Sequence, residues 1–268
     1  MKIGILGFGK MGEALTEGLR NSRDSAQFAI QATTQSQQSA EDAARKLKIN
    51  CHTQNTKLIQ ESEVIILCVK PHQAEKILKQ HSGDFTSEKL LISICASLTT
   101  DLISNWSGKK AAVIRAMPNT PCLIREGMTC LNVGPNAKEA HLKMAEKIFN
   151  TVGKTAKVEE SLMDGVTGLS GCGPAYIYLI IEALSEAGVK VGLPRKVATL
   201  LSAQTLLGAA KMVLKRGEHP AALKDEVTTP AGCTIDGLMA LEEGKLRVTL
   251  IKAVLAAAKR SQSLRGSS

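Results

Sequence analysis

Met1-Lys-Ile-Gly-Ile-Leu6 leads directly into Gly7-Phe-Gly9-Lys-Met-Gly12, and Glu13-Ala-Leu-Thr-Glu-Gly-Leu19 follows it. This order predicts an apolar strand, a tight turn and a helix. In such a turn the first glycine permits the sharp exit from the strand, the second lets the backbone approach a pyrophosphate, and the third lets the helix pack closely on the sheet. The phosphates would lie at the unpaired N–H groups of the helix N-terminus. The stretch therefore predicts a dinucleotide-binding turn, and a purely structural βα turn is the alternative.

Outward from this turn, short apolar runs alternate with helix-like segments up to residue 158. The runs predicted as strands are Phe28–Thr33, Val64–Val69, Leu90–Ala96, Ala111–Met117, Met128–Val133 and Thr155–Val158. Helices are predicted at Ser39–Lys48, Thr99–Trp106 and Ala137–Asn150. Strands that alternate with helices are typical of a doubly wound parallel sheet. Residues 1–158 are therefore predicted to form a Rossmann-type NAD(P)-binding domain.

The pattern changes after Val158, because no further strand is predicted. The helical candidates are Leu162–Leu169, Ala175–Gly188, Pro194–Arg216, Ala221–Val227, Ile235–Glu243 and Leu246–Ser263. Several are apolar nearly all round and must be covered on more than one face, which predicts a homodimer or a larger assembly. Residues 159–268 are therefore predicted to be an all-α substrate-binding and dimerisation domain. The fold class is α/β: an N-terminal Rossmann-type doubly wound sheet followed by an all-α C-terminal domain.

The composition is that of an ordinary globular protein. Of the 268 residues, 44% are hydrophobic and 22% are charged, which is enough for a sizeable core. The net charge of +9 is scattered along the chain, and only four Phe, two Tyr and one Trp are present. These aromatic residues are too few for base stacking, so we expect no nucleic-acid partner. The positive charge is better interpreted as a field that attracts small anionic substrates.

The cysteines and the chain start indicate the compartment. The seven cysteines lack a Cys-x-x-Cys pair or a neighbouring histidine cluster, which predicts neither a disulfide framework nor a metal site. The glycine turn begins after six residues, so no signal peptide is predicted. The uncharged stretches Val166–Ile181 and Val197–Ala210 are shorter than the roughly 18 residues of a membrane helix. We therefore expect a soluble, cytoplasmic protein with no membrane partner.

The end of the second predicted strand bears on the choice of cofactor. A Rossmann site that prefers NAD usually places Asp or Glu about 20 residues past the glycine turn, where it binds the ribose 2′-hydroxyl. Residues 25–40 contain no acidic side chain, and the strand ends in Thr33-Thr34-Gln35-Ser36. Hydroxyls without a carboxylate can accept a 2′-phosphate, so the sequence favours NADP over NAD. Ordinary loop hydroxyls are the alternative.

Other strand ends are candidates for the same site, because ligands of open α/β sheets bind at the carboxyl ends of the strands. Val69 and Lys70-Pro71 follow a buried strand and are expected to border the cofactor. His72 is interpreted as a surface residue at the start of a helix. The two prolines of Pro118-Asn119-Thr120-Pro121 predict a rigid, extended turn at another strand end.

Two glycine-rich segments interrupt the helical half. Ser170-Gly-Cys-Gly-Pro174 and Thr228-Thr-Pro-Ala-Gly-Cys-Thr234 each combine hydroxyls with backbone N–H groups at a predicted helix N-terminus, which suits a carboxylate. A kinked helix is the alternative for the first segment, and a plain capped turn for the second. Because both follow a cofactor domain, together they predict a substrate site.

Five motifs in this order resemble the pyrroline-5-carboxylate reductases. They are Gly7-Phe-Gly-Lys-Met-Gly12, Val69-Lys-Pro71, Arg115-Ala-Met-Pro-Asn-Thr-Pro121, Thr167-Gly-Leu-Ser-Gly-Cys-Gly-Pro-Ala-Tyr176 and Asp225-Glu-Val-Thr-Thr-Pro-Ala-Gly-Cys-Thr234. The last of them is the signature of that family. The resemblance implies reduction of 1-pyrroline-5-carboxylate to L-proline, the last step of proline biosynthesis. It also implies NADPH as the cofactor, with NADH as an alternative, and a homodimer assembled into a decamer.

The resemblance further implies a role for individual residues. The implied cofactor-binding residues are Gly7, Phe8, Gly9, Lys10, Met11, Gly12, Thr34, Asn55, Val69, Lys70, Pro71 and Asn119. The implied substrate-binding residues are Thr229, Gly232, Cys233 and Thr234, and Thr234 is the implied catalytic residue. Two departures from the family pattern put the fine geometry in doubt. Cys172 stands where serine is common, and Ala231-Gly232-Cys233 replaces a more usual Gly-Gly-Ala.

Two other functions compete with this interpretation. The β-hydroxyacid dehydrogenases share the plan of a Rossmann domain followed by helices. Their reaction, however, resembles cases in which a catalytic lysine lies a few residues into the helix after a glycine-rich loop. The corresponding stretch here, residues 173–179, contains no lysine. A non-catalytic NADP sensor is the second alternative, and an activity assay would distinguish it from an enzyme.

Overall fold

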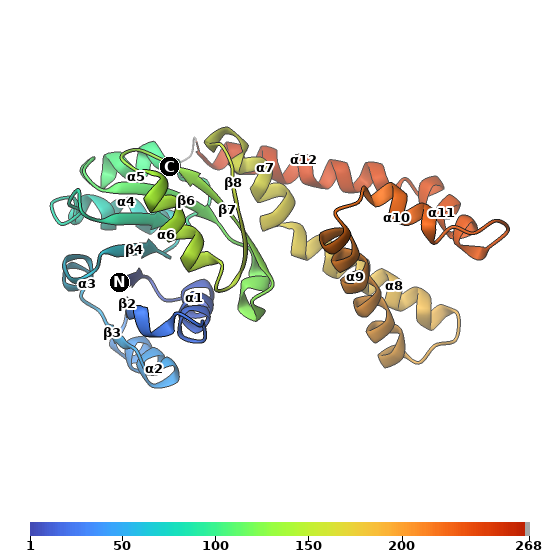
Figure 1. Ribbon diagram of the computed structural model, residues 1–268, viewed down its shortest axis with the longest axis horizontal. Coiled ribbons are helices and arrows are strands. Elements are labelled where there is room, and N and C mark those ends of the chain that lie inside the picture. The colour runs from blue at the N-terminus through green and yellow to red at the C-terminus, as the bar shows by residue number, and fades with distance from the viewer. Residues whose placement is uncertain (266–268) are drawn as a thin grey trace. The chain divides into compact units, whose positions relative to one another are not determined.

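The computed structural model describes residues 1–265 and divides the chain into two compact units (Figure 1). One unit contains Met1–Cys172 and the chain from Leu255 onward, and the other contains Gly173–Val254. The secondary structure changes from mixed to helical after residue 157, but the first unit continues past that point. The domain division between residues 158 and 159 stays a prediction, and residues 266–268 of the expected second domain lie outside the described residues.

An eight-stranded sheet forms the centre of the first unit. Its strands are β1 (Lys2–Leu6), β2 (Ala29–Thr33), β3 (Asn50–His52), β4 (Val64–Leu67), β5 (Leu90–Ser93), β6 (Ala112–Met117), β7 (Gly127–Val133) and β8 (Gly153–Lys157). They are arranged in the order β3-β2-β1-β4-β5-β6-β7-β8. The order reverses beside β1, as in a doubly wound Rossmann sheet. The predicted strands are therefore present, and the short edge strand β3 is an addition.

The sheet is not parallel throughout, and this corrects the expectation from the sequence. β7 pairs with β6 in the antiparallel direction, whereas β8 pairs parallel with β7. A parallel neighbour requires a crossover of about a dozen or more residues, and the connection between β6 and β7 is shorter than that. The strand after the Pro118–Pro121 turn, β7, can therefore pair with β6 only in the antiparallel direction.

The helices mostly begin and end within two residues of the predicted bounds. They are α1 (Lys10–Arg20), α2 (Gln37–Leu47), α3 (Asn55–Glu61), α4 (Pro71–Gln80), α5 (Thr100–Trp106), α6 (Glu139–Phe149), α7 (Met163–Val166), α8 (Gly173–Lys190), α9 (Arg195–Arg216), α10 (Pro220–Glu226), α11 (Cys233–Glu243) and α12 (Leu246–Arg265). The short helix α3 was not predicted from the sequence, and only the start of α4 was predicted, at His72.

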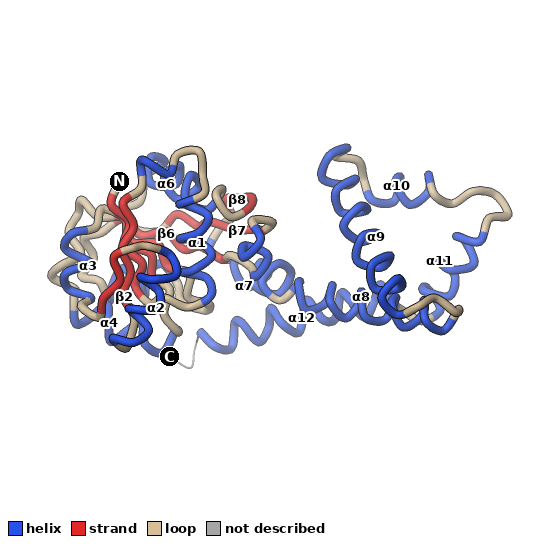
Figure 2. The backbone as a smooth tube through the Cα atoms, turned by 90° about the horizontal axis from the view of Figure 1, so that it is seen from below, coloured by secondary structure: helices blue, strands red, loops and turns tan. Residues whose placement is uncertain are grey.

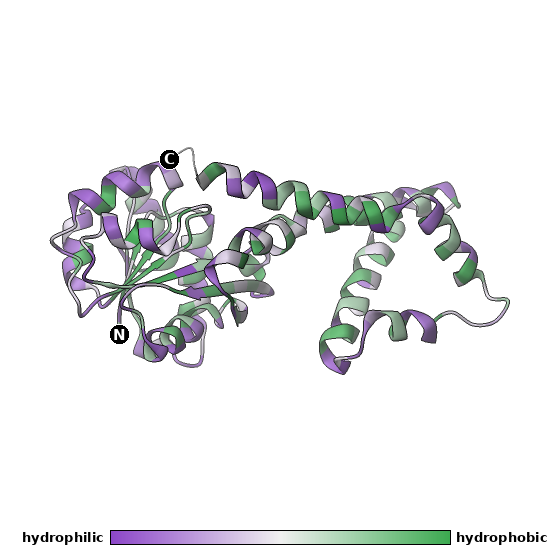
Figure 3. Cartoon of the chain, turned by 90° about the horizontal axis from the view of Figure 1, so that it is seen from above, coloured by the Kyte–Doolittle hydropathy of each residue, from purple (hydrophilic) through white to green (hydrophobic). Residues whose placement is uncertain are grey.

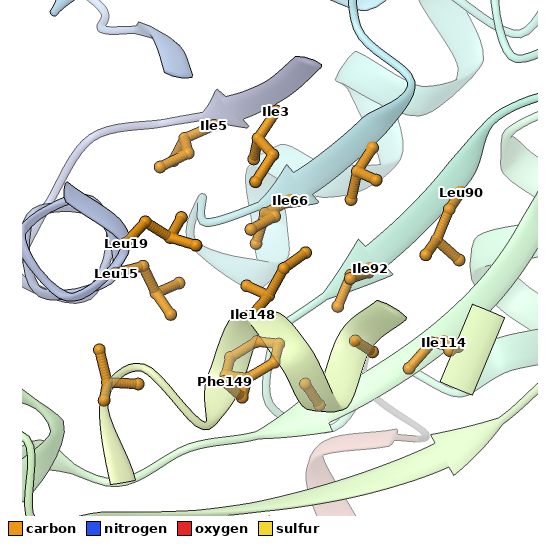
Figure 4. Close-up of a cluster of buried hydrophobic side chains, with 14 of the residues drawn as sticks. Ile3, Ile5, Leu15, Leu19, Ile66, Leu90, Ile92, Ile114, Ile148 and Phe149 are labelled. Carbon is orange, nitrogen blue, oxygen red and sulfur yellow. The ribbon is translucent and has the colours of Figure 1, made fainter. Parts of the chain in front are cut away.

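The sheet is covered on both faces, which explains why its central strands are apolar without interruption. In β4, Val64 and Ile66 pack in one hydrophobic cluster while Ile65 and Leu67 pack in the other. Helices α1 and α6 cover the first cluster, which Figure 4 shows around Leu15, Leu19, Ile148 and Phe149. Helices α3, α4 and α5 cover the second cluster. A strand buried on both faces has no polar side to alternate with.

The elements of the second unit are all helices (Figure 2), and they are rich in hydrophobic residues (Figure 3). Many of these residues are exposed within one chain. Helices α8 and α9 form its main contact, and they approach closely because a Cβ on Gly188 would lie 2.7 Å from the Cβ of Ala198. Leu200 is 67% exposed and Leu214 is 65% exposed, both on α9. By length and composition alone, α9 is also the one helix within residues 1–265 that could span a membrane. An exposed apolar surface of this kind is typical of a subunit interface.

Candidate active site

A cleft of about 650 Å³ opens beside the glycine turn in the first unit. Its walls come from the ends of β1, β2 and β4 and from helix α4. Seven of the expected cofactor residues line it: Gly7, Phe8, Gly9, Thr34, Asn55, Val69 and Lys70. The volume is within the range of small-molecule sites. The strand ends that the sequence singled out are thus brought together around one cleft.

The three glycines of the turn differ in what their missing side chains permit. Gly7 has φ +81°, and a Cβ there would lie 2.5 Å from Val69 Cγ1. Gly12 lies against Ile5 and Phe8, so a Cβ would be within 3.3 Å of both. A Cβ on Gly9 would meet no atom within 4 Å. The first and third glycines therefore serve the local fold, and the second leaves room for a ligand.

The remaining residues of the turn act through the backbone. Lys10, Met11 and Gly12 form the first turn of α1, where the N–H groups of a helix have no intrahelical partner. Gly9 is the N-cap residue, and no side chain caps the helix. These free N–H groups and the helix dipole suit a pyrophosphate. The side chains of Lys10 and Met11 do not line the cleft, nor does Gly12.

Pro71 and Asn119 are not among the residues that line the cleft. Pro71 is the first residue of α4 and fixes the start of that helix. Asn119 accepts the N–H of Met128 at 2.9 Å, and its amide group donates to the carbonyl and the hydroxyl of Ser170 at 3.3 and 3.4 Å. All of these contacts are within the first unit. Asn119 therefore ties the turn after β6 to the segment around Ser170.

The end of β2 provides the neutral wall that the sequence predicted. The Thr34 hydroxyl donates to the Ser36 carbonyl at 2.9 Å, and the Ser36 hydroxyl accepts the N–H of Ser39 at 3.2 Å as the N-cap of α2. No Asp or Glu is among the residues that line the cleft within the described chain. Without a carboxylate, nothing repels a 2′-phosphate, so the cleft fits NADP.

One wall of the cleft comes from a helix face that the sequence did not reveal. His72, Gln73, Lys76, Ile77 and Gln80 of α4 line the cleft. Their spacing of three and four residues places them on one side of the helix, while Ala74 and Leu78 are buried in the core. His72 is exposed, as expected, but it also faces the cleft. The only signal for this wall in the sequence was that α4 has a polar face opposite its buried face.

The first glycine-rich segment is not a loop, and the expectation of free N–H groups there is wrong. Thr167–Gly171 forms a π-helical turn between α7 and α8, and the Cys172 N–H donates to the Thr167 carbonyl at 2.9 Å. The backbone donors of this segment are therefore used by the helix. Single π-turns of this kind bend a helix and are frequent at functional sites.

The second glycine-rich segment, in the helical unit, is a turn that leads into α11. Gly232 is the N-cap residue of α11 and donates its N–H to the Thr229 carbonyl at 3.0 Å. Thr234, in the first turn of α11, is half-buried, and its hydroxyl has no hydrogen-bond partner within residues 1–265. The turn therefore presents a free hydroxyl beside the unpaired N–H groups of a helix N-terminus, which suits an anionic ligand.

The departure at Ala231 has a physical cost. Ala231 has φ +58°, the left-handed conformation in which a residue with a Cβ is less stable by about 1–2 kcal/mol. Glycine, which the resembled family commonly has here, adopts this conformation freely. An alanine at Gly232 would meet a steric clash instead, because its Cβ would lie 2.5 Å from Thr229 Oγ1.

Gly9→Ala is expected to fold like the wild type but to bind NADPH at least about tenfold more weakly, because its methyl group would occupy the place of the pyrophosphate. The space around a Cβ at Gly9 is empty, so the free energy of unfolding should not change much. Titration calorimetry and urea unfolding measure the two quantities. Gly83→Ala is the matched control, since it also meets no atom within 4 Å but lies outside the cleft. Wild-type affinity in Gly9→Ala would contradict the assignment of the cleft.

Iodoacetamide is expected to label Cys233 in the native protein and to spare Cys68 and Cys95. Cys233 is exposed, whereas burial raises the pKa of the Cys68 thiol and raises the pKa of Cys95 to about 11. The thiolate is the reactive form, so both of these thiols should react slowly at neutral pH. Mass spectrometry of peptides after brief labelling measures each site. Equal labelling of all three cysteines would contradict the raised pKa of the Cys68 and Cys95 thiols.

Two family models match the chain. The description "Pyrroline-5-carboxylate reductase dimerisation" matches residues 160–264, and "NADP oxidoreductase coenzyme F420-dependent" matches residues 2–97. The first covers the helices with uncovered apolar surface, including α9. The second covers the glycine turn and all the residues that line the cleft. The chain therefore forms homo-oligomers through its helical part and binds NAD(P)H in its N-terminal part.

Known proteins resemble the chain over nearly its whole length. Pyrroline-5-carboxylate reductases of Arabidopsis thaliana and Methanosarcina acetivorans are 41% and 42% identical over 98% of this chain, which spans 95% and 97% of those proteins. The crystal structure of Plasmodium falciparum pyrroline carboxylate reductase with NADP bound is 34% identical, with a TM-score of 0.87 over 99% of this chain and 98% of that one. The Coxiella burnetii pyrroline-5-carboxylate reductase is 35% identical, with a TM-score of 0.90 over 98% and 97%. The chain thus belongs to the pyrroline-5-carboxylate reductase family of NAD(P)H-dependent oxidoreductases.

Proposed function

We propose that the protein reduces the imine of 1-pyrroline-5-carboxylate to L-proline, the last step of proline biosynthesis. The observation that carries this proposal is the similarity to enzymes of that name across both halves of the chain. When bound, NADPH supplies the hydride for the imine carbon. NADPH is favoured over NADH because no carboxylate lines the cleft within the described residues.

The proposed cofactor site follows the walls of the cleft. Gly7 and Gly9 shape the turn over the pyrophosphate, and the N–H groups of Lys10, Met11 and Gly12 donate to it. These donors are fixed by the helix and need no rearrangement when an anion binds. Phe8, Thr34, Asn55, Val69 and Lys70 border the rest of the dinucleotide. Pro71 and Asn119 contribute by holding neighbouring segments in place.

The proposed substrate site is the turn before α11. Thr229, Gly232 and Cys233 surround the N-terminus of that helix, where free N–H groups and the helix dipole stabilise a carboxylate. The Thr234 hydroxyl forms a hydrogen bond with the ring nitrogen, and its oxygen accepts the N–H of the protonated imine. This arrangement is supported by the free hydroxyl and the uncapped helix N-terminus that lie together in the turn.

The reaction makes few chemical demands on side chains. A protonated imine is already a strong electrophile, so the site needs alignment and a hydrogen-bond partner at nitrogen rather than a nucleophile. Thr234 orients the substrate, but its hydroxyl is too weak an acid to be the final proton source. We assign that role to solvent. This accounts for a site without a histidine or a pair of carboxylates among its proposed substrate residues.

We also propose a decamer built from homodimers, in the cytoplasm. The dimerisation model over residues 160–264 and the exposed apolar helices support the dimer as its building block. Sedimentation equilibrium measures the assembly. A stable monomer would contradict it, because a single chain leaves residues such as Leu200 and Leu255 more than 60% exposed.

The experiment that tests the function follows NADPH absorbance with 1-pyrroline-5-carboxylate, with NADH in parallel. Rapid oxidation that yields proline would establish the reaction, and the ratio of the two rates would establish the preferred cofactor. Tight NADPH binding without oxidation would reject this function. A hydroxyacid dehydrogenase or a sensor would then have to be tested with other substrates.

A further inference from the structure

The cleft contains a cation that the proposed cofactor contacts do not use. Lys76 lies in the middle of α4 and lines the cleft. It forms no ion pair or hydrogen bond through its side chain within residues 1–265. On the same helix, Lys79 is paired with Glu75 at 2.6 Å and does not line the cleft. Lys76 is therefore a positive charge in the cleft wall that has no countercharge within residues 1–265.

The position of Lys76 along the cleft separates it from the other lysine there. Lys70 precedes α4 and adjoins Val69, which contacts the glycine turn. Lys76 lies six residues further along, about 9 Å at the helical rise of 1.5 Å per residue. Lys70 thus belongs to the pyrophosphate end of the cleft. Lys76 belongs to the part of the wall that the middle of α4 forms.

Among the described residues, the β2 wall of the cleft offers no cation to a dianion, and several of its donors are already used. The Thr34 hydroxyl is used by the Ser36 carbonyl, and the Ser36 hydroxyl is bonded to Ser39. The N–H of Ser39 is also satisfied, by the Ser36 cap. What remains there is the partial positive charge of the α2 N-terminus and neutral donors such as the Gln35 amide. A phosphate bound at that wall would lack a full countercharge from β2 and α2.

We propose that Lys76 is the residue that selects the 2′-phosphate of NADPH, because it supplies the countercharge that the β2 wall lacks. The proposal deepens the cofactor site and rests on NADPH binding in this cleft. A contact from Lys76 to the 2′-phosphate differs from a contact to adenine or to the pyrophosphate, because NADH carries both of those groups but not the 2′-phosphate. A lysine that selects the 2′-phosphate affects only ligands that bear this group.

The test uses two nucleotides without nicotinamide, 2′,5′-ADP and 5′-AMP, and measures their Kd by titration calorimetry. Lys76→Gln should bind 2′,5′-ADP about tenfold more weakly, as expected for the loss of one charged hydrogen bond, and 5′-AMP as well as the wild type does. Lys76→Arg should restore most of the affinity. Lys79→Gln, on the same helix, should leave both affinities unchanged. The wild-type advantage of 2′,5′-ADP should also shrink as salt is raised.

Three outcomes would overturn the proposal. An unchanged 2′,5′-ADP affinity in Lys76→Gln, with normal binding by the wild type, would reject the role of Lys76 alone. An equal loss for both nucleotides would place Lys76 at a part of the cofactor that NADH shares. Failure of the wild type to bind 2′,5′-ADP would reject the cofactor cleft together with Lys76. The assay of NADPH oxidation remains independent of these measurements.

Discussion

Thr234→Ala is expected to lower kcat about 100-fold, a loss of the size seen when one hydrogen-bonding group at a reacting centre is removed. The Kd of NADPH should stay near the wild-type value. In the proposed site the hydroxyl touches only the substrate nitrogen, and the cleft that would hold NADPH is built from other residues. The hydroxyl has no hydrogen-bond partner within the described residues, so its loss breaks no bond of the fold. Steady-state kinetics and NADPH titration measure the two effects.

Two further variants separate the chemistry from the structure of the turn. Thr228→Ala removes a hydroxyl that donates to the Lys224 carbonyl at 2.8 Å, and it should change kcat little. Thr234→Ser keeps the hydroxyl and should recover most of the activity. If Thr234→Ala retained wild-type turnover, Thr234 would have no part in the mechanism. If Thr228→Ala were equally slow, the shape of the turn would matter rather than the hydroxyl of Thr234.

The sequence predicted the central sheet well, because its signals are local. Apolar runs such as Val64–Leu67 are buried on both faces, and this leaves an uninterrupted hydrophobic stretch that is easily recognised. The edge strand Asn50–His52 was missed because it is short and only partly buried. The direction of β7 was missed for another reason. It depends on the length of a connection rather than on the composition of the strand.

The two glycine-rich segments show where sequence patterns become ambiguous. Both place glycine and hydroxyl residues before a helix, yet Thr167–Gly171 is a π-helical turn and the turn that ends at Gly232 leads into α11. A π-turn inserts one residue into a continuous helix, and its composition resembles that of a loop. The distinction lies in backbone hydrogen bonds, such as the one from Cys172 to Thr167, which no residue pattern reports directly.

The cofactor cleft was predictable at its strand ends and not at its helix face. Strand ends converge by topology, so Gly9, Thr34 and Val69 could be grouped from the amino-acid sequence alone. Lys76 and Gln80 reach the cleft only because α4 packs on β4 with Ala74 and Leu78 inward. The orientation of α4 depends on how the helix packs in the folded chain, which the sequence pattern does not report. A polar helix face in a sequence is usually just solvated, so it gave no specific signal.

Arg115 forms the most buried ion pair of the described chain, in the first unit. It extends from β6, is 1% exposed, and pairs through Nη1 with Glu160 Oε1. Glu160 Oε2 also accepts the N–H and the hydroxyl of Thr100, at 3.2 and 2.9 Å. The pair therefore connects three segments: β6, the start of α5 and the turn before α7. The Nη2 atom of Arg115 has no partner within residues 1–265, so the guanidinium depends on Glu160.

Arg115→Ala is expected to lower the free energy of unfolding by about 3–5 kcal/mol, because it removes one partner of a buried pair and leaves a cavity. Urea unfolding at a fixed protomer concentration measures the loss, since an oligomer's stability depends on concentration. Lys79→Ala, which breaks the surface pair with Glu75, should change the stability much less. A similar small loss in Arg115→Ala would show that the guanidinium is hydrated rather than buried.

A double-mutant cycle separates the ion pair from the packing around Arg115. Glu160→Gln keeps the size of the side chain and its acceptor for Thr100, but leaves the guanidinium without a countercharge. If the pair acts as a unit, the double variant should be less destabilised than the sum of the two single variants. Strict additivity would mean that Arg115 acts through its volume alone. Arg115→Met should then be nearly as stable as the wild type, since methionine fills much of the same space without a charge that must be paired.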